Sequence, residues 1–368
     1  MQEPKQKTAD RLFLLLSAVL VIFGLVMLAS ASSPAGYSRF GDTYYFIKKQ
    51  LLFGLLPGLF LFLILARFNY HLLQKFIWLI YLFSLIILSL VFVPGVSLVL
   101  NGSRSWIQMF GLSLQPAEFA KLAVILMLAK LLAESKDLSD WKNSLMPIFA
   151  TLMPVVLLVA AQPDVGTLAI LVVIIFAMLY LADIPKHYLA ILGLAGTVCF
   201  AGLLIIAPYR VQRLTTFLHP ELDPQGVGYQ VNQAFLAVGS GGIFGLGLGH
   251  SRQKFQYLPE VQADSIFAVI AEEMGLLITV ALVVLIAFLG LRGFKIAKGA
   301  PDQFGRLLVS GIMVWFVWQS FFNICATIGL MPLSGVPLPF ISHGGTAMLA
   351  LLAAFGIVAN VSKYTKFN

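Results

Sequence analysis

Charged residues are scarce in this chain: they make up 11% of its 368 residues, whereas hydrophobic residues make up 60%. Soluble domains carry roughly 25% charged residues, so the composition excludes an ordinary soluble protein. The mean hydropathy of +0.93 indicates a polytopic membrane protein instead. The net charge of +8 lies mostly in short segments between apolar runs. It therefore reflects orientation in a bilayer, and we expect no nucleic-acid partner.

Cysteine is scarce as well. The two cysteines, Cys199 and Cys325, both lie within apolar runs, which predicts small core residues and no disulfide or zinc pattern. The five histidines are scattered without metal-ligand spacing. The polar N-terminus leads into a full-length apolar run without a small-residue cleavage site, so we expect a retained cytoplasmic tail rather than a secretory signal.

Apolar runs of about 17 to 25 residues predict an all-α polytopic membrane protein with ten spans. We expect one domain, 1–368, with cytoplasmic tails at 1–11 and 362–368. One long extracytoplasmic loop, 208–264, separates helices 7 and 8, and only this loop is long enough to carry structure of its own. The expected spans are Leu12–Ala31, Leu51–Ala66, Phe76–Val93, Ala117–Ala133, Leu145–Ala161, Gly166–Ala182, Tyr188–Ala207, Ser265–Gly290, Leu307–Leu330 and Ile341–Val361.

The distribution of lysines and arginines predicts the orientation of the chain in the membrane. Ten spans place both termini on one side, and most of the 24 basic residues fall in inner segments when that side is the cytoplasm. Four of the others belong to the long loop, which crosses largely regardless of charge. The sequence therefore predicts cytoplasmic termini and a long loop that faces outward.

The interval 208–275 is the one long polar stretch in this apolar sequence. It runs into an apolar helix at Asp264, and Glu272 and Glu273 follow about two turns later. Helix geometry places Glu272 nearly over Asp264 and about 12 Å deeper. A carboxylate within a membrane is energetically unfavourable, so its presence indicates a functional role. Asp264 is either a helix cap stabilised by the macrodipole or a reacting group.

Acids and bases gather just before Asp264. Glu260, Arg252 and Lys254 lie within a dozen positions of it, which suits a phosphorylated substrate beside a general base. The neighbouring run 239–249 is rich in glycine, but it lacks a preceding strand and the GK[ST] ending of a nucleotide-binding phosphate loop.

Two further polar clusters open predicted helices on the same face. In QPAEFAK, 115–121, Glu118 and Lys121 lie one turn apart and form either a local ion pair or part of a site. In QPDVG, 162–166, Asp164 caps the next helix, contributes to a site, or does both.

A fourth cluster, GLMPLSGVPLPFISHGGTAM at 329–348, joins the last two spans. Its prolines and glycines demand a fixed non-helical path at membrane depth, which is tolerated only when the path packs in protein or lines a cavity. Ser342 and His343 then offer polar groups, although a lone histidine is more often a hydrogen-bonded interfacial residue than a base. The shared outer face predicts that the four clusters form one site.

Read together, these motifs resemble the SEDS family of bacterial peptidoglycan polymerases along essentially the full chain. The resemblance rests on QPAEFAK, QPDVG, DPQGVGYQ at 223–230, GSGGIFGLGLGHSRQKFQYLPEVQAD at 239–264, IAEEMG at 270–275 and GLMPLSGVPLPFISHGG at 329–345. SRQKFQYLPE and the closing NVSKY are more similar to the division protein FtsW, or its sporulation relative, than to the elongation protein RodA.

The resemblance implies a ten-helix enzyme that joins lipid II units outside the bacterial cytoplasmic membrane, with Asp264 as the catalytic aspartate. It makes Glu118, Lys121 and Asp164 cavity residues, and matches Glu260, Glu272 and Glu273 to polar positions of less defined role. It also implies a divalent cation, Mg²⁺ or Mn²⁺, a class B penicillin-binding protein as partner, and other divisome proteins. The chain departs from the family at Ala117, Ala263, Ser265 and His343, where Ser, Thr, Phe and Tyr are usual.

The mechanism that we hypothesise uses Asp264 to take the proton of an acceptor sugar 4-hydroxyl, with inversion at the donor carbon. Lys121, with Arg210, Arg213 or a metal ion, offsets charge on the leaving pyrophosphate. Glu118, Asp164, Glu260, Glu272, Ser342 and His343 complete the predicted substrate-binding set. Two alternatives stay open: a flippase for lipid-linked precursors, and a scaffold that recruits the transpeptidase without turnover.

Overall fold

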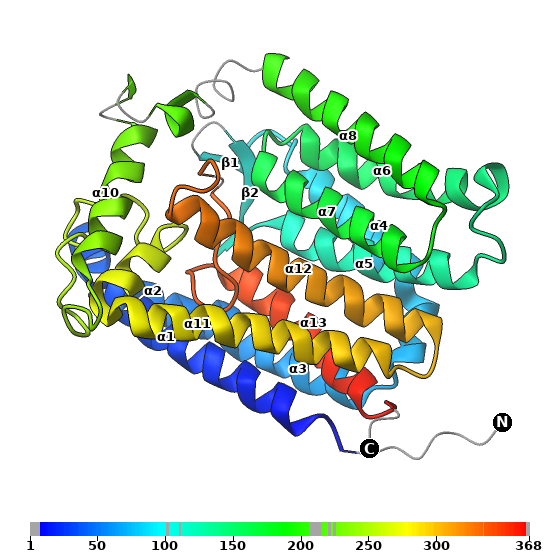
Figure 1. The fold of residues 1–368 in the computed structure, drawn as a ribbon, viewed down its shortest axis with the longest axis horizontal. Coiled ribbons are helices and arrows are strands. Elements are labelled where there is room, and N and C mark those ends of the chain that lie inside the picture. Colours follow the sequence, from blue (N-terminus) through cyan, green and yellow to red (C-terminus); the bar gives the residue numbers. More distant parts are fainter. Residues whose placement is uncertain are drawn as a thin grey trace.

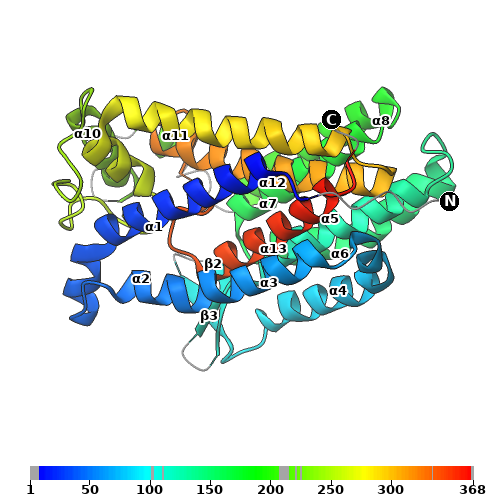
Figure 2. The ribbon, with the colours of Figure 1, turned by 90° about the horizontal axis from the view of Figure 1, so that it is seen from below.

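The computed structural model of the chain describes residues 8–100, 103–109, 112–206, 215–219, 222–223, 226–333 and 335–365. Most of them form helices that run along one common direction (Figures 1 and 2). The helices are α1 (Arg11–Phe40), α2 (Tyr45–Gln50), α3 (Leu56–Arg67), α4 (Tyr70–Leu90), α5 (Pro116–Glu134), α6 (Met146–Ala160), α7 (Val165–Leu181), α8 (Lys186–Ile206), α10 (Val227–Ser240), α11 (Ile266–Lys298), α12 (Gln303–Thr327) and α13 (Gly345–Ser362). Single π-helical turns, Leu51–Leu55 and Trp141–Leu145, lead into α3 and α6.

The all-α membrane fold predicted from the sequence is confirmed. Each of the ten predicted apolar runs overlaps a helix, with ends that differ by a few residues. Within the described ranges, seven helical segments are long and apolar enough to cross a membrane, and α7 is a shorter apolar helix. The number of crossings therefore stays a prediction.

The helices differ sharply in burial. In its most apolar window α13 is 89% buried and α12 is 67% buried, whereas the segment that contains α3 is 17% buried. Helices α12 and α13 are therefore central, and α1, α3 and α4 present apolar side chains outward, as lipid-facing helices do. Asp10 just before α1 donates its main-chain N–H to Ser362 at the end of α13, at 3.0 Å. Both ends of the described chain thus lie at one end of the bundle, and α10 lies at the other (Figure 1).

A small sheet that the sequence analysis missed lies between α4 and α5. Strands β1 (Ser97–Leu100), β2 (Ser103–Met109) and β3 (Leu112–Leu114) pair antiparallel in that order. The expectation that only the long loop carries structure of its own was therefore wrong. Short strands with alternating side chains give a weak signal beside ten strong apolar runs.

Helix α11 is broken at Gly275, where the backbone angles are φ 74° and ψ 178°. The break frees two carbonyls and two N–H groups inside an apolar bundle, where each must find a partner. The glycine-rich run supplies them: Leu246 N–H donates to Glu272 O at 3.0 Å and Gly247 N–H to Glu273 O at 2.9 Å. In return, the N–H groups of Leu276 and Leu277 donate to the carbonyls of Gly242 and Ile243 at 2.9 and 3.3 Å.

Glycine is required there because the two backbones nearly touch. A Cβ on Gly275 would lie 2.2 Å from the main-chain nitrogen of Gly245, and a Cβ on Gly245 would lie 2.2 Å from Glu273 O. The run 239–249 thus serves backbone packing, which agrees with its rejection as a phosphate loop.

We predict that Gly275→Ala lowers the apparent melting temperature of the detergent-solubilised protein. The added methyl group clashes with the backbone of the run 239–249. Alanine at this positive φ also adds a strain of about 1–3 kcal/mol. Gly249→Ala is the matched control, because Gly249 also has positive φ, 84°, but has nothing within 4 Å of the added carbon. Equal losses in the two variants would contradict the packing explanation.

Candidate functional site

The four polar clusters meet at the end of the bundle that carries α10. Ser342 Oγ donates to Ala263 O at 2.5 Å, and His343 N–H donates to Gln262 O at 2.7 Å. The Gln115 side-chain amide donates to Asp164 at 3.3 Å, and its main-chain N–H donates to Thr346 Oγ1 at 3.3 Å. The four clusters, which stand at the N-terminal ends of α5, α7, α11 and α13, therefore form one region.

Asp264 lies in the turn just before α11, and α12 holds its backbone. The side-chain amide of Asn323 donates to Asp264 O at 2.9 Å and to Val336 O at 2.8 Å. Thr327 Oγ1 also approaches Asp264 O, at 3.4 Å. Asn323 thus fastens the Asp264 turn and the 336–343 loop to one helix.

Glu118 and Lys121 form the ion pair that their spacing predicts, at 2.8 Å. Both side chains are 1% exposed. Lys121 Nζ also donates to Gln319 Oε1 at 2.7 Å and lies 4.9 Å from the centroid of the Trp315 ring. Gln319 in turn donates to Pro337 O at 3.0 Å. These contacts make the pair a support for the 336–343 loop, and its direct contact with a substrate stays a prediction.

Asp164 and Glu260 both have partners within the chain. Asp164 caps α7, accepting from the N–H of Thr167 at 3.0 Å and from its hydroxyl at 2.9 Å, and it also binds Gln115. Glu260 has a positive φ of 50° and accepts from the Gln262 side chain at 2.9 Å. Asp164 therefore caps a helix within the site region, and Glu260 shapes the turn that leads to Asp264.

Ser342 and His343 close the region from the side of α13. Ser342 Oγ accepts from Leu338 N–H at 2.8 Å while it donates to Ala263 O. Burial and the nearby Lys49 cation lower the pKa of His343 to about 4, so its imidazole is neutral at pH 7. Its Nδ1 is buried and has no hydrogen-bond partner in the described part of the chain.

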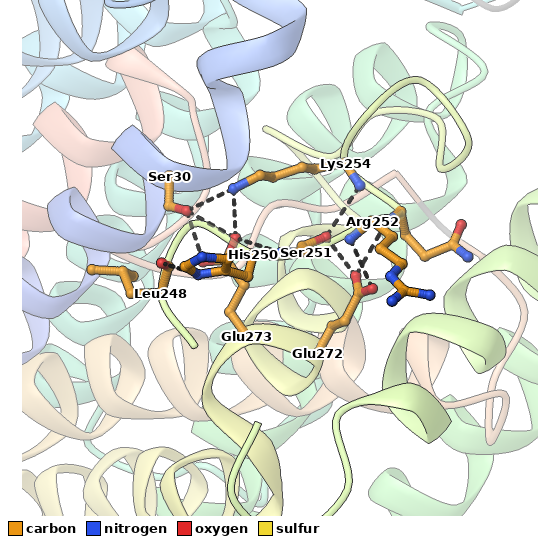
Figure 3. A network of polar contacts seen from close by, with 9 residues as sticks. Ser30, Leu248, His250, Ser251, Arg252, Lys254, Glu272 and Glu273 are labelled. Atoms are coloured by element: carbon orange, nitrogen blue, oxygen red, sulfur yellow. Dashed lines mark hydrogen bonds and ion pairs between the residues drawn. The ribbon is translucent and has the colours of Figure 1, made fainter. Parts of the chain in front are cut away.

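Glu272 and Glu273 are 1% exposed and hold the turn 251–254 against α11 and α1 (Figure 3). Glu272 accepts from Ser251 Oγ at 2.5 Å, and Glu273 accepts from Lys254 Nζ at 2.7 Å. Arg210 and Arg213, the two remaining predicted residues, lie outside the described residues.

Comparison with known proteins identifies the family. The FtsW, RodA and SpoVE family model, described as a cell cycle protein, matches residues 10–367. The chain belongs to this family. It is 39% identical over 364 residues to the stage V sporulation protein E of Bacillus subtilis, covering 99% of both chains. It is 34% identical over 354 residues to the probable peptidoglycan glycosyltransferase FtsW of Geobacter sp. strain M18, covering 96% of both.

Solved structures agree with the family assignment. A chain from a structure described as "Structural coordination of polymerization and crosslinking by a peptidoglycan synthase complex" matches with a TM-score of 0.80 and 29% identity, covering 96% of this chain and 97% of that one. The rod shape determining protein RodA of Thermus thermophilus matches with a TM-score of 0.71 and 27% identity, covering 98% of both chains.

A cavity of about 330 Å³ lies beside the site of this family member. Its walls are mostly apolar, and Lys49, His343, Ser113 and Thr346 supply its polar groups. The other lining residues are Leu52, Phe53, Pro57, Leu114, Phe119, Gly345 and Leu349. An apolar cavity with a cation and a neutral imidazole suits a ligand that has both an apolar chain and a polar head.

The sequence analysis missed the polar row of α12. Gln319, Asn323 and Thr327 lie at successive i+4 positions of one apolar helix, and all are at most 2% exposed. Side chains at this spacing share a helix face, and amides inside a membrane span are costly unless bonded. The i+4 spacing of these polar residues in an apolar helix could therefore have predicted a polar face turned toward the site.

The predicted divalent cation finds no ready cluster of ligands. Among the described residues, no three His, Cys, Asp or Glu side chains lie together as a metal site would need. The described residues thus offer no ready site for a resident ion, and the divalent cation stays a prediction.

We predict that Lys121→Met strongly destabilises the protein, by about 3–5 kcal/mol, because it leaves the Glu118 carboxylate buried and unpaired. The double variant Lys121→Met/Glu118→Gln should recover most of the loss. Thermal unfolding in detergent measures both.

Lys48→Met is the control, because Lys48 forms a pair of similar length with Asp42, 2.7 Å against 2.8 Å, but its side chain is 61% exposed. It should change stability by about 1 kcal/mol or less. A Lys121→Met loss no larger than the control's would mean that the buried pair contributes little.

Proposed function

We propose that this protein polymerises lipid II, a polyprenyl pyrophosphate that carries a disaccharide-peptide, into glycan strands. Its class, a peptidoglycan glycosyltransferase of cell-wall synthesis, rests on the family and on relatives of that name that cover nearly the whole chain. The observation that carries the proposal is the placement of Asp264, in a turn fastened by α12 and by the 336–343 loop where all four polar clusters meet.

Asp264 is the general base in this proposal. Its carboxylate takes the proton of the acceptor sugar 4-hydroxyl as that oxygen bonds to the anomeric carbon of the donor. The bond from that carbon to the pyrophosphate oxygen breaks, and the polyprenyl pyrophosphate leaves with inversion. General base catalysis of this kind contributes about 10² to 10⁴-fold.

The neighbouring groups have supporting roles in the proposal. The buried Nδ1 of neutral His343 is a polar atom that a sugar hydroxyl would satisfy. Asp164, Glu260 and Ser342 shape the walls of the site. Arg210, Arg213 and Lys121 are the cations proposed to offset the pyrophosphate charge. For Lys121, whose ammonium is now enclosed, this requires the Glu118 and Gln319 contacts to open.

The substrate's chemistry also fits the setting. A polyprenyl chain needs an apolar path beside the reacting groups, and the cavity next to His343 has apolar walls and the Lys49 cation. We place the site at the outer face of the bacterial cytoplasmic membrane with both termini cytoplasmic, which the basic residues favour. The proposed partners are a class B penicillin-binding protein that crosslinks the new strand, and other divisome proteins, because the sequence favours a role in division.

The deciding experiment gives labelled lipid II to purified protein, with and without its cognate transpeptidase and Mg²⁺ or Mn²⁺, and resolves the glycan chains. We expect polymer from the native protein and a loss of at least 100-fold in Asp264→Asn, which keeps the shape of the side chain but not its basicity. Asp42→Asn, a partly exposed carboxylate after α1, should polymerise normally.

Equal polymer from Asp264→Asn and native protein would remove Asp264 from the mechanism. If every condition gives no polymer while lipid II still binds, translocation in vesicles would support the flippase. Neither translocation nor polymer would support the scaffold.

A further inference from the structure

A buried polar network joins three segments of the chain just before the Gly275 break in α11 (Figure 3). It contains Ser30 of α1, the turn 251–254 and the pair Glu272 and Glu273 of α11. Ser251, Lys254 and both glutamates are at most 4% exposed. Because these charged groups are enclosed and bind one another, we infer a role for them within the chain itself.

One half of the network fixes the turn by its backbone. The Glu272 carboxylate accepts from Ser251 Oγ at 2.5 Å and from the N–H groups of Arg252 and Gln253 at 2.9 and 3.4 Å. Ser251 Oγ also accepts from Lys254 N–H at 3.1 Å. A carboxylate that accepts from adjacent backbone N–H groups fixes the path of the backbone as well as its distance from the carboxylate.

The other half adds a buried ion pair. Lys254 Nζ donates to Glu273 at 2.7 Å and to Ser30 Oγ at 3.1 Å, and Ser30 Oγ donates to the same carboxylate at 2.7 and 2.9 Å. Buried ion pairs add little net stability over apolar replacements. Their better attested effect is to select one arrangement of the parts that they join.

The network and Asp264 lie at the two ends of one folded-back segment. The chain leaves the network at Lys254 and returns to the start of α11 at Asp264, while Glu272 and Glu273 lie about two turns further along the same helix. Leu258 and Val261 of the returning segment are 3% exposed and pack into the core. A shift of the turn on Glu272 and Glu273 would therefore be passed along this segment to Asp264.

We propose that Glu273 and Lys254, together with Glu272 and Ser30, are positioning residues for Asp264. The ion pair sets where the 251–263 segment rests on α11, and so where it presents the carboxylate. This inference rests on the proposed function for its kinetic consequence, and its structural part stands independently. A misplacement of about 1 Å can reduce a rate about 100-fold.

The test uses the double variant Lys254→Met/Glu273→Gln, which removes both charges. It leaves an amide for Ser30 Oγ and for the Ser251 N–H, which donates to Glu273 Oε1 at 3.4 Å. We expect the kcat of glycan polymerisation to fall about 10 to 100-fold with KM for lipid II nearly unchanged. Hydrogen exchange should accelerate in 255–264 and stay unchanged in α12 and α13. The single variant Lys254→Arg, which keeps the charge, should retain most of the native kcat.

Lys48→Met/Asp42→Asn is the matched control, because it neutralises an exposed ion pair on the turn after α1 and should change neither kcat nor exchange in 255–264. The inference is overturned if the double variant keeps native kcat and exchange, or if exchange rises uniformly with a lower melting temperature. If native protein makes no polymer, the proposed function fails, and local exchange in 255–264 still decides whether the network positions this segment.

Discussion

Polar groups enclosed between these helices depend on partners within the protein, because lipid offers none. The break at Gly275 illustrates the constraint. Two carbonyls and two N–H groups leave the α11 ladder, and the glycine-rich run 242–247 takes up all four. The enclosed carboxylates follow the same rule, each with a cation or several donors beside it. The site region forms where loops from distant parts of the chain come together and supply hydrogen-bond partners to these enclosed groups.

Side-chain amides carry much of this assembly. Gln115 joins α5 to α7 and to the start of α13. Asn323 binds the Asp264 turn and the 336–343 loop together, and Gln50 accepts from Gly344 N–H at 2.9 Å. An amide both donates and accepts without charge, so it links backbone groups without the desolvation penalty of an ion. The loops at this end of the bundle are thereby tied to the helices around them.

The charged residues divide by their surroundings. Glu118 with Lys121, and Glu273 with Lys254, are enclosed ion pairs: the first reaches the 336–343 loop through Gln319, and the second holds the turn 251–254. Asp264 differs from them because its turn is fixed through its main-chain oxygen, which accepts from Asn323, and its carboxylate is the proposed reacting group. The pair Glu273 and Lys254 is thus assigned to support alone, whereas the proposed chemistry rests on Asp264, and Lys121 contributes to both.

The amino-acid sequence by itself determined the membrane class, the positions of the ten apolar helices and the four polar clusters, because long apolar runs and prolines or glycines at their ends are local signals. The Glu118 and Lys121 pair was also predictable, since i and i+3 share a helix face. The sequence did not show that Glu272 and Glu273 bind the turn 251–254, that the glycine-rich run 242–247 fills a break in α11, or that Gln319 and Asn323 face the site. Those contacts join residues that are tens of positions apart, or meet across a chain reversal, and only the packing of the helices decides which polar groups become neighbours.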